Sequence, residues 1–221
     1  MIPTFDQWIQ YIFDHPVTDP AWYWEDNWAV QYDPLPPGKS VEYLTRLFKR
    51  SQSVLGSYSD GQMDQGLDYL INVSCGDYFR DFFEPSVPWP KRRGGIRSVS
   101  NLFRELFAKR CTPHLSHLDE PGVGPLNSVC YMWWDIAPLP MLVLEKDGGS
   151  ESSLECLGVM QDALALDSVA CQESALYGLG HYATYCPNQV HPIIDSYLKG
   201  KRKLRKELRS YAENAREGAV L

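Results

Sequence analysis

The residues best suited to bind a metal ion lie close together near the middle of the chain. Cys111, His114 and His117 follow one another at intervals of three, and Asp119 and Glu120 come directly after them. Thiolate, imidazole and carboxylate groups are the ligands that zinc takes in proteins. The spacing matches none of the common structural-zinc patterns, and no Cys-x-x-Cys pair could complete the set. We therefore expect a polar loop with two surface histidines, and keep a metal site at Cys111, His114 and His117 as the alternative.

A second set of reactive side chains lies on one predicted helix in the C-terminal third. Cys171 and His181 are ten residues apart, about 15 Å along a helix axis, so they cannot form a nucleophile–base pair with each other. His181 lies about two turns after Glu173 and would need a partner from another helix. We expect a histidine that packs at a helix interface. The sequence contains no G-x-S-x-G, Walker A, H-E-x-x-H or G-x-G-x-x-G motif.

Aromatic side chains are concentrated between residues 19 and 38, in a segment that is also rich in proline. The carboxylates of Glu25 and Asp26 stand among the rings. Bulky rings in such a segment pack over helix ends, and we favour that interpretation. The alternative is a recognition surface for a sugar, a cation or a partner peptide. The rings of this segment are Trp22, Tyr23, Trp24, Trp28 and Tyr32.

Basic residues form two clusters, one between residues 91 and 97 and one between residues 199 and 209. Basic helices can bind phosphates or acidic protein surfaces. The clusters contain no interleaved tryptophan or phenylalanine, and the chain is acidic overall, so we expect solvated helix faces. If both clusters lie on one side of the molecule, an acidic partner becomes the better interpretation. The candidate contact residues in them are Arg92, Arg93, Arg202 and Arg205.

The composition is that of a globular protein with excess negative charge. Of the 221 residues, 44% are hydrophobic and 22% are charged, and the formal net charge is −7. That charge argues against general nucleic-acid binding. No apolar run approaches the roughly 20 residues of a membrane span, and MIPTFDQWIQ lacks the features of a signal peptide. We expect a cytoplasmic protein without a cofactor, whose six cysteines are reduced.

Helix starts can be located from short polar motifs. A serine or threonine followed three residues later by glutamine or glutamate predicts a capping box. Such pairs occur at Thr4–Gln7, Ser59–Gln62 and Ser152–Glu155, and further N-cap candidates are Ser40 and either Asp167 or Ser168. We expect the helices that follow Ser40 and Ser59 to pair as a hairpin. The proline- and glycine-rich segment 77–95 predicts a loop.

Hydrophobic periodicity predicts three consecutive amphipathic helices between residues 154 and 198. The second contains Gly178 and Gly180, which lower helix propensity by roughly 1 kcal/mol each relative to alanine. We infer that another backbone approaches closely there. A helix over residues 127–136 is apolar nearly all round, which is typical of a buried helix. Residues 141–144 form the one strand-like run.

The segment ACQESALYGLG, residues 170–180, resembles the second helix of a HEAT-type repeat, in which small residues let helices stack. The resemblance covers about 40 residues, one repeat length, and no second copy occurs at a fixed period. It implies an all-α fold of stacked helical hairpins, with at most one minor strand. We expect a single domain over residues 1–221, with a soft boundary between an aromatic-rich part, 1–90, and a HEAT-like part, 91–221.

The functional prediction is a protein–protein interaction module without catalytic activity, namely an adaptor, a regulator or an immunity-type partner. Helical stacks present a concave surface to another protein, and no catalytic motif is visible. The alternative is a small-molecule-binding or metal-dependent enzyme that uses the segment Trp22–Trp28 or the Cys111, His114 and His117 cluster. The expected contact residues for a partner are Trp22, Tyr23, Trp24, Glu25, Trp28, Arg92, Arg93, Arg202 and Arg205.

Overall fold

The structure is a computed structural model that describes residues 1–25, 32–137, 151–200 and 204–220. These residues form helices and connecting segments, with no strand or sheet among them, which confirms the all-α prediction. The strand-like run 141–144 lies outside the described residues. None of the helices in the described ranges is long and apolar enough to span a membrane.

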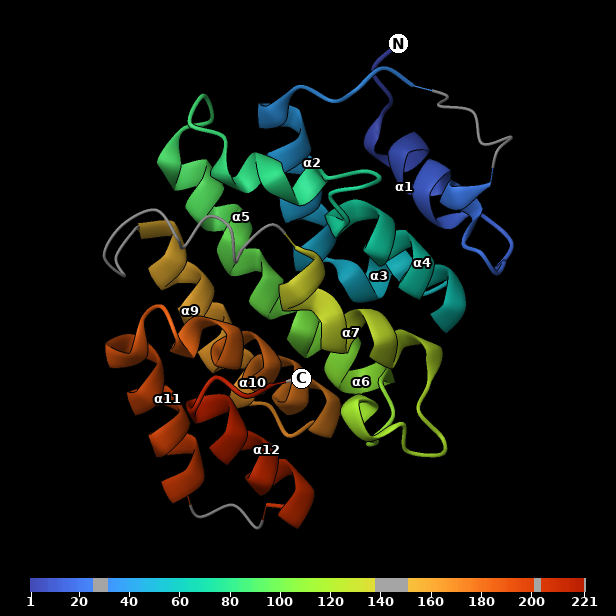
Figure 1. Ribbon diagram of the computed structural model, residues 1–221. Coiled ribbons are helices and arrows are strands. Elements are labelled where there is room, and N and C mark those ends of the chain that lie inside the picture. The colour runs from blue at the N-terminus through green and yellow to red at the C-terminus, as the bar shows by residue number, and fades with distance from the viewer. Residues whose placement is uncertain (26–31, 138–150, 201–203, 221) are drawn as a thin grey trace.

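The long helices lie in two rows that run through the molecule (Figure 1). Within a row each helix packs against the next, and α10 also packs against α9 and α11 of the other row. Because α5 contacts both α2 and α9, helix packing continues across the expected boundary at residue 90. One row contains α2 (Pro37–Lys49), α5 (Trp89–Leu102), α9 (Glu151–Leu164) and α11 (Pro187–Lys199). The other contains α4 (Asp60–Ile71), α7 (Pro125–Ile136), α10 (Val169–Ala183) and α12 (Lys206–Arg216).

Shorter elements fill the space around and between the rows. The N-terminal helix packs on α4, the 3-10 helix η2 contacts α2, α4 and α5, and the π-helical turn η3 continues α5 toward α7 and α10. These elements are α1 (Phe5–Phe13), η1 (Trp22–Trp24), α3 (Ser51–Leu55), η2 (Tyr78–Phe83), η3 (Phe103–Phe107), α6 (Ala108–Arg110) and η4 (Ser116–Leu118).

The predicted N-caps are confirmed at three helices. Thr4 and Ser59 form complete capping boxes with Gln7 and Gln62, at the starts of α1 and α4. The hydroxyl of Ser168 accepts the N–H of Cys171 and caps α10. Each of these caps depends on residues within one helical turn, which is why the sequence alone locates them.

Two other predicted caps are wrong. Ser40 is fully buried inside α2, because Pro37 at the first helical position already starts that helix. Ser152 lies inside α9, which begins at Glu151. The Glu155 carboxylate does not reach back to Ser152, since it binds the guanidinium groups of Arg93 and Arg97 on α5.

The predicted hairpin and the predicted loop between residues 77 and 95 are also wrong. The helices that follow Ser40 and Ser59 do not pack closely on each other: α2 packs on α5, and α4 packs on α7. Residues 78–83 form η2, and Gly94 and Gly95 lie inside α5. A Cβ at Gly95 would lie 2.3 Å from Cε1 of Phe82, so this glycine makes room for a ring of η2. Tertiary contact, not local turn chemistry, explains its presence.

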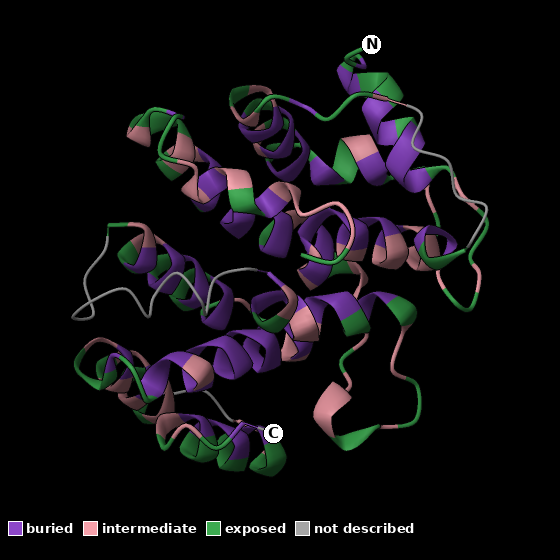
Figure 2. Cartoon of the chain, turned by 45° about the horizontal axis from the view of Figure 1, so that its top comes forward, coloured by how far each residue is buried: buried purple, intermediate pink, exposed green. Residues whose placement is uncertain are grey.

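Helix α10 is buried nearly all round, as Figure 2 shows for the interior of the second row. Of its 15 residues only Val169 and His181 are not buried. A Cβ at Gly178 would lie 2.6 Å from Cγ of Trp134 on α7, and one at Gly180 would lie 2.3 Å from a methyl carbon of Val220. The predicted approach of another backbone is wrong, because the groups that lie closest to the two glycines are the side chains of Trp134 and Val220.

Asp64 is a half-buried carboxylate at the contact between α4 and α7. Its Oδ1 accepts the backbone N–H of Val129 at 3.0 Å. Burial raises its pKa to about 6, although the hydrogen bond from Val129 opposes the shift. The folded protein therefore holds a proton on Asp64 at pH values where the unfolded chain has lost it.

The substitution Gly178→Ala should destabilise the protein by about 1–3 kcal/mol, because the added methyl overlaps Trp134. Gly158→Ala on the exposed side of α9 is the matched control, since nothing lies within 4 Å of its Cβ position. That control should gain about 0.5–1 kcal/mol. Urea unfolding of both variants measures the difference. Equal effects at the two glycines would contradict the proposed α7–α10 contact.

Asp64 should also make the free energy of unfolding depend on pH. Because the folded pKa lies above the unfolded value of 3.8, stability should fall by roughly 3 kcal/mol as the pH rises from about 4 to above 6. Asp64→Asn should abolish this contribution to the pH dependence of stability. The asparagine amide oxygen can still accept the backbone N–H of Val129. Denaturant titrations of both proteins at several pH values measure the slopes. Parallel profiles would show that Asp64 does not titrate as described.

Candidate functional site

The three residues kept as alternative metal ligands contact different partners. The Sγ of Cys111 lies 3.7 Å from the carbonyl oxygen of Leu126, and His114 lies against Gly122. His117 is bound to Glu173. Across the described ranges, no group of three or more histidine, cysteine, aspartate or glutamate side chains is arranged to hold a metal ion.

Glu173 is a fully buried carboxylate on α10, and it binds the segment that carries the predicted metal ligands. Its two oxygens accept the backbone N–H groups of Ser116 and His117, each at 3.0 Å. The Nδ1 of His117 lies 2.6 Å from Oε1 of the same carboxylate. Three donors thus surround one buried charge, which satisfies a group that would otherwise strongly destabilise the fold.

The His117 ring is held on its other side by aromatic contacts. It stacks on Tyr211 of α12, with ring centroids 4.1 Å apart and planes 19° apart. The hydroxyl groups of Tyr211 and Tyr131 lie 3.2 Å apart, and burial raises the pKa of both phenols. We interpret the Glu173–His117 pair as the contact that fixes the segment 111–124 against α10 and α12.

Cys171 and His181 occupy packing positions on α10. The Cys171 thiol is fully buried and lies 3.8 Å from the carbonyl oxygen of Phe103. The His181 ring meets Tyr177 at 84°, and its Nε2 lies 3.9 Å from a carboxylate oxygen of Asp135. Neither side chain contributes to the Glu173 contact.

The basic residues of the first cluster make contacts within the chain. Arg92 donates to the carbonyl oxygen of Val87 at 2.8 Å and lies over the ring of Trp89. Arg93 binds Glu155 at 2.6 Å, and Arg97 binds its second oxygen. Burial opposes ionisation of Glu155, but the two guanidinium groups hold its pKa below the ordinary value.

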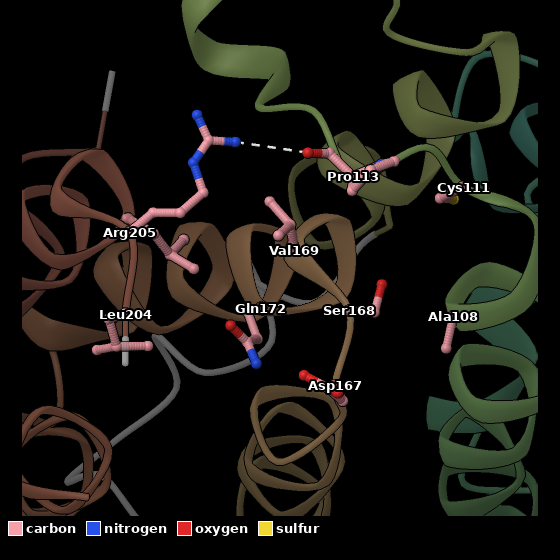
Figure 3. A pocket seen from close by; sticks show the side chains of 10 residues that line it. Ala108, Cys111, Pro113, Asp167, Ser168, Val169, Gln172, Leu204 and Arg205 are labelled. Atoms are coloured by element: carbon pink, nitrogen blue, oxygen red, sulfur yellow. Dashed lines mark hydrogen bonds between the residues drawn. The ribbon is translucent and has the colours of Figure 1, made fainter. Parts of the chain in front are cut away.

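The second basic cluster contributes one described contact residue. Arg205 binds Glu120 through both terminal nitrogens and donates to the carbonyl oxygen of Pro113 at 3.4 Å. The Arg205 side chain lines a pocket of about 570 Å³ (Figure 3). The pocket lies between the start of α10, the end of α6 and the start of α12. Gln172 lines the same pocket. Its side-chain amide donates to the carbonyl oxygen of Leu166 and accepts a hydrogen bond from the hydroxyl of Tyr197. Arg202 lies outside the described residues.

The predicted aromatic segment divides into buried and exposed parts. Trp22 stacks on His15 with centroids 3.9 Å apart, and Tyr23 donates to Asp68 of α4. Both are buried, as the packing interpretation expects, whereas Trp24 is 50% exposed and Glu25 is exposed. Trp28 lies outside the described residues.

Aromatic residues from separate parts of the chain meet in a pocket of about 400 Å³ at the N-terminal end of the rows. Only one of its rings, Tyr32, belongs to the aromatic segment identified from the sequence. Carboxylates of Asp33, Asp77 and Asp81 also line it, together with Arg80. We call this site the aromatic pocket; its rings are Trp8, Tyr11, Tyr32, Tyr69 and Tyr78.

Asp77 is held in the aromatic pocket by an unusual backbone conformation. Its φ of 50° lies in the left-handed region, which is uncommon for a residue other than glycine. One carboxylate oxygen binds Arg80 at 2.6 Å. The other, Oδ1, is buried and has no hydrogen-bond partner among the described residues. Burial raises the pKa of Asp77 and of Asp81 above their ordinary values.

Removing the Glu173 carboxylate should strongly destabilise the protein. Glu173→Ala leaves three donors of the segment 111–124 without their acceptor, so a loss of about 3 kcal/mol or more is expected. Glu213→Ala, an exposed change on α12, is the control. Hydrogen exchange of the Ser116 and His117 amides should speed up in the first variant only. Unchanged exchange at these two amides would contradict the role assigned to Glu173.

No protein-family model matches this chain, and neither does any curated protein or solved structure.

Proposed function

We propose that the chain is a protein–protein interaction module that acts in the cytoplasm as an adaptor, a regulator or an immunity-type partner. Its contact surface is the acidic N-terminal third, and its partner is a basic protein. The observation that carries this proposal is the charge of residues 1–38, which contain six aspartate and glutamate residues and no lysine or arginine.

The negative charge of the whole chain is concentrated in its first part. Residues 1–90 contain 13 aspartates and glutamates against 5 lysines and arginines, a net charge of −8. Residues 91–221 contain 15 aspartates and glutamates and 16 lysines and arginines, a net charge of +1. A surface of one sign speeds encounter with a partner of the opposite sign and suppresses binding of partners with the same sign.

Exposed apolar side chains accompany this charge. Four of the eight large hydrophobic residues found exposed in the described ranges lie within the first 24 residues: Met1, Ile2, Val17 and Trp24. Nearby carboxylates that are also exposed include Asp14, Asp19 and Glu25. Tryptophan is enriched among the residues that dominate binding energy at protein interfaces. Trp24 and Glu25 are therefore the predicted contact residues that this proposal retains.

The basic clusters favour a basic partner over an acidic one. Arg93 and Arg97 bind Glu155, and Arg205 binds Glu120, so these guanidinium groups already have intramolecular partners. An acidic protein would have to compete with those ion pairs. We propose that these arginines hold α5, α9 and α12 in a HEAT-like stack and do not contact the partner.

A comparison of captured proteins tests this proposal. The immobilised full chain, incubated with lysate from cells that produce it, should retain a basic protein that high salt releases. The double substitution Trp24→Ala and Glu25→Gln should reduce recovery at least tenfold, because it removes a central ring and its adjacent charge. Glu213→Gln on α12 is the control and should leave recovery unchanged. Equal recovery by all three proteins would contradict the proposed surface, as would capture of an acidic protein only.

A further inference from the structure

We propose that the aromatic pocket binds an alkylammonium cation, supplied by a lysine side chain of the basic partner. This inference rests on the proposed function for the source of the cation, but the pocket's affinity for the cation can be measured without any partner. An ammonium group over aromatic faces is attracted by the ring quadrupoles, and most strongly when water is excluded.

The rings of the aromatic pocket enclose space from several directions. Tyr11 meets Tyr32 at 81° and Tyr69 at 77°, with centroids 5.6 Å and 6.5 Å apart. Trp8 meets Tyr78 at 76°, with centroids 5.6 Å apart. Because the rings are steeply inclined to one another, they line different sides of the pocket, and a compact ammonium group can contact several of them at once. A flat guanidinium would instead stack on a single ring face.

The carboxylates supply the charge that such a cation needs. The buried Oδ1 of Asp77 accepts no hydrogen bond from the part of the chain that the structure describes, and the Asp77 backbone is left-handed. Residues kept in such sparsely populated conformations cluster at functional sites. The carboxylates of Asp33, Asp77 and Asp81 line the pocket, Arg80 binds Asp77, and the N-terminal ammonium binds Asp33. Negative charge still exceeds positive charge there.

The same end of the molecule already uses cation–ring contacts of this kind. The guanidinium carbon of Arg46 lies 3.8 Å from the ring centroid of Phe5, and Nζ of Lys39 lies 4.9 Å from that of Tyr43. Both rings adjoin Trp8. No described lysine or arginine makes such a contact with a ring of the aromatic pocket. Arg80 instead pairs with Asp77 and is itself mostly exposed.

Two tyrosines of the aromatic pocket are kept uncharged by burial. Burial raises the pKa of Tyr69 and of Tyr78, so their rings remain phenols. The pocket volume of about 400 Å³ falls within the range of small-ligand sites and accommodates the end of a lysine side chain.

Calorimetric titration of the full chain with two matched pairs of small molecules tests the inference. The first pair is Nα-acetyl-lysine methylamide and its Nε-acetylated form, which lacks the charge. The second is choline and 3,3-dimethylbutan-1-ol, a neutral molecule of the same shape. The charged member of each pair should bind at least tenfold more tightly, because only it is attracted by rings and carboxylates.

Three variants and a control locate the binding. Two substitutions should each weaken lysine-amide binding at least fivefold. Tyr32→Ala removes a half-buried ring that lines the pocket. Asp77→Asn removes a carboxylate, and asparagine tolerates the left-handed backbone. Arg80→Ala should tighten binding, because it frees the Oδ2 of Asp77 from an intramolecular cation. A merely structural role would not produce that gain. Glu213→Gln should bind like the wild type, and circular dichroism checks that each variant is folded.

Further outcomes test the inference and the proposed function separately. It fails if the neutral molecules bind as tightly as the charged ones, or if Tyr32→Ala and Asp77→Asn bind like the wild type. Binding of choline without binding of the lysine amide would overturn the assignment to a protein side chain. If the lysine amide binds but no basic protein is captured, only the proposed function fails. If a basic protein is captured through Trp24 and Glu25 but the lysine amide does not bind, only the role proposed for the aromatic pocket fails.

Discussion

The crossing of α7 and α10 is the contact on which the arrangement of the two rows depends. Gly178 leaves space for Trp134 at that crossing, and α10 in turn contacts α9, α11 and α12. A side chain at position 178 would separate α10 from α7 and disturb every helix packed on α10. The same helix carries Glu173, whose buried carboxylate holds the segment 111–124. One helix therefore fixes both the packing of the C-terminal part and the position of its longest described loop.

The N-terminal end has a different chemistry because its contacts are made by rings and carboxylates. Tyr23 binds Asp68 on α4, and Asp64 on the same helix binds the start of α7. Helix α4 thereby connects the aromatic segment to the second row. The aromatic pocket lies where α1, α4 and η2 meet, so its walls are positioned by packed helices. Rigid elements of this kind are suited to presenting a preorganised binding site.

The parts of the structure that could be predicted from the sequence are those set by neighbours along the chain. The caps at Thr4, Ser59 and Ser168 are local, and the apolar stripes located the central helices. The two rows could not be found as a repeat, because the helices of the first row begin at residues 37, 89, 151 and 187, at intervals of 52, 62 and 36. Gly95 was misinterpreted because its role depends on Phe82, a contact that no local pattern reveals.

The aromatic pocket was missed for the same reason. Trp8, Tyr69 and Tyr78 lie on three elements, at positions that read as ordinary apolar stripes. The candidate metal ligands make separate contacts, since His117 binds Glu173 and the Cys111 thiol lies near the carbonyl oxygen of Leu126. A left-handed aspartate is the one feature of the pocket that marks it as unusual, and backbone conformation cannot be derived from the type of a single residue.

The most direct test of this account is a nuclear magnetic resonance titration of the isotope-labelled chain with Nα-acetyl-lysine methylamide. The account predicts that the indole N–H signal of Trp8 and the amides of residues 76–81 shift together. The indole signals of Trp133 and Trp134, in the core between the rows, should stay in place. Shifts centred on the core tryptophans or on the segment 111–124, with Trp8 unmoved, would contradict it.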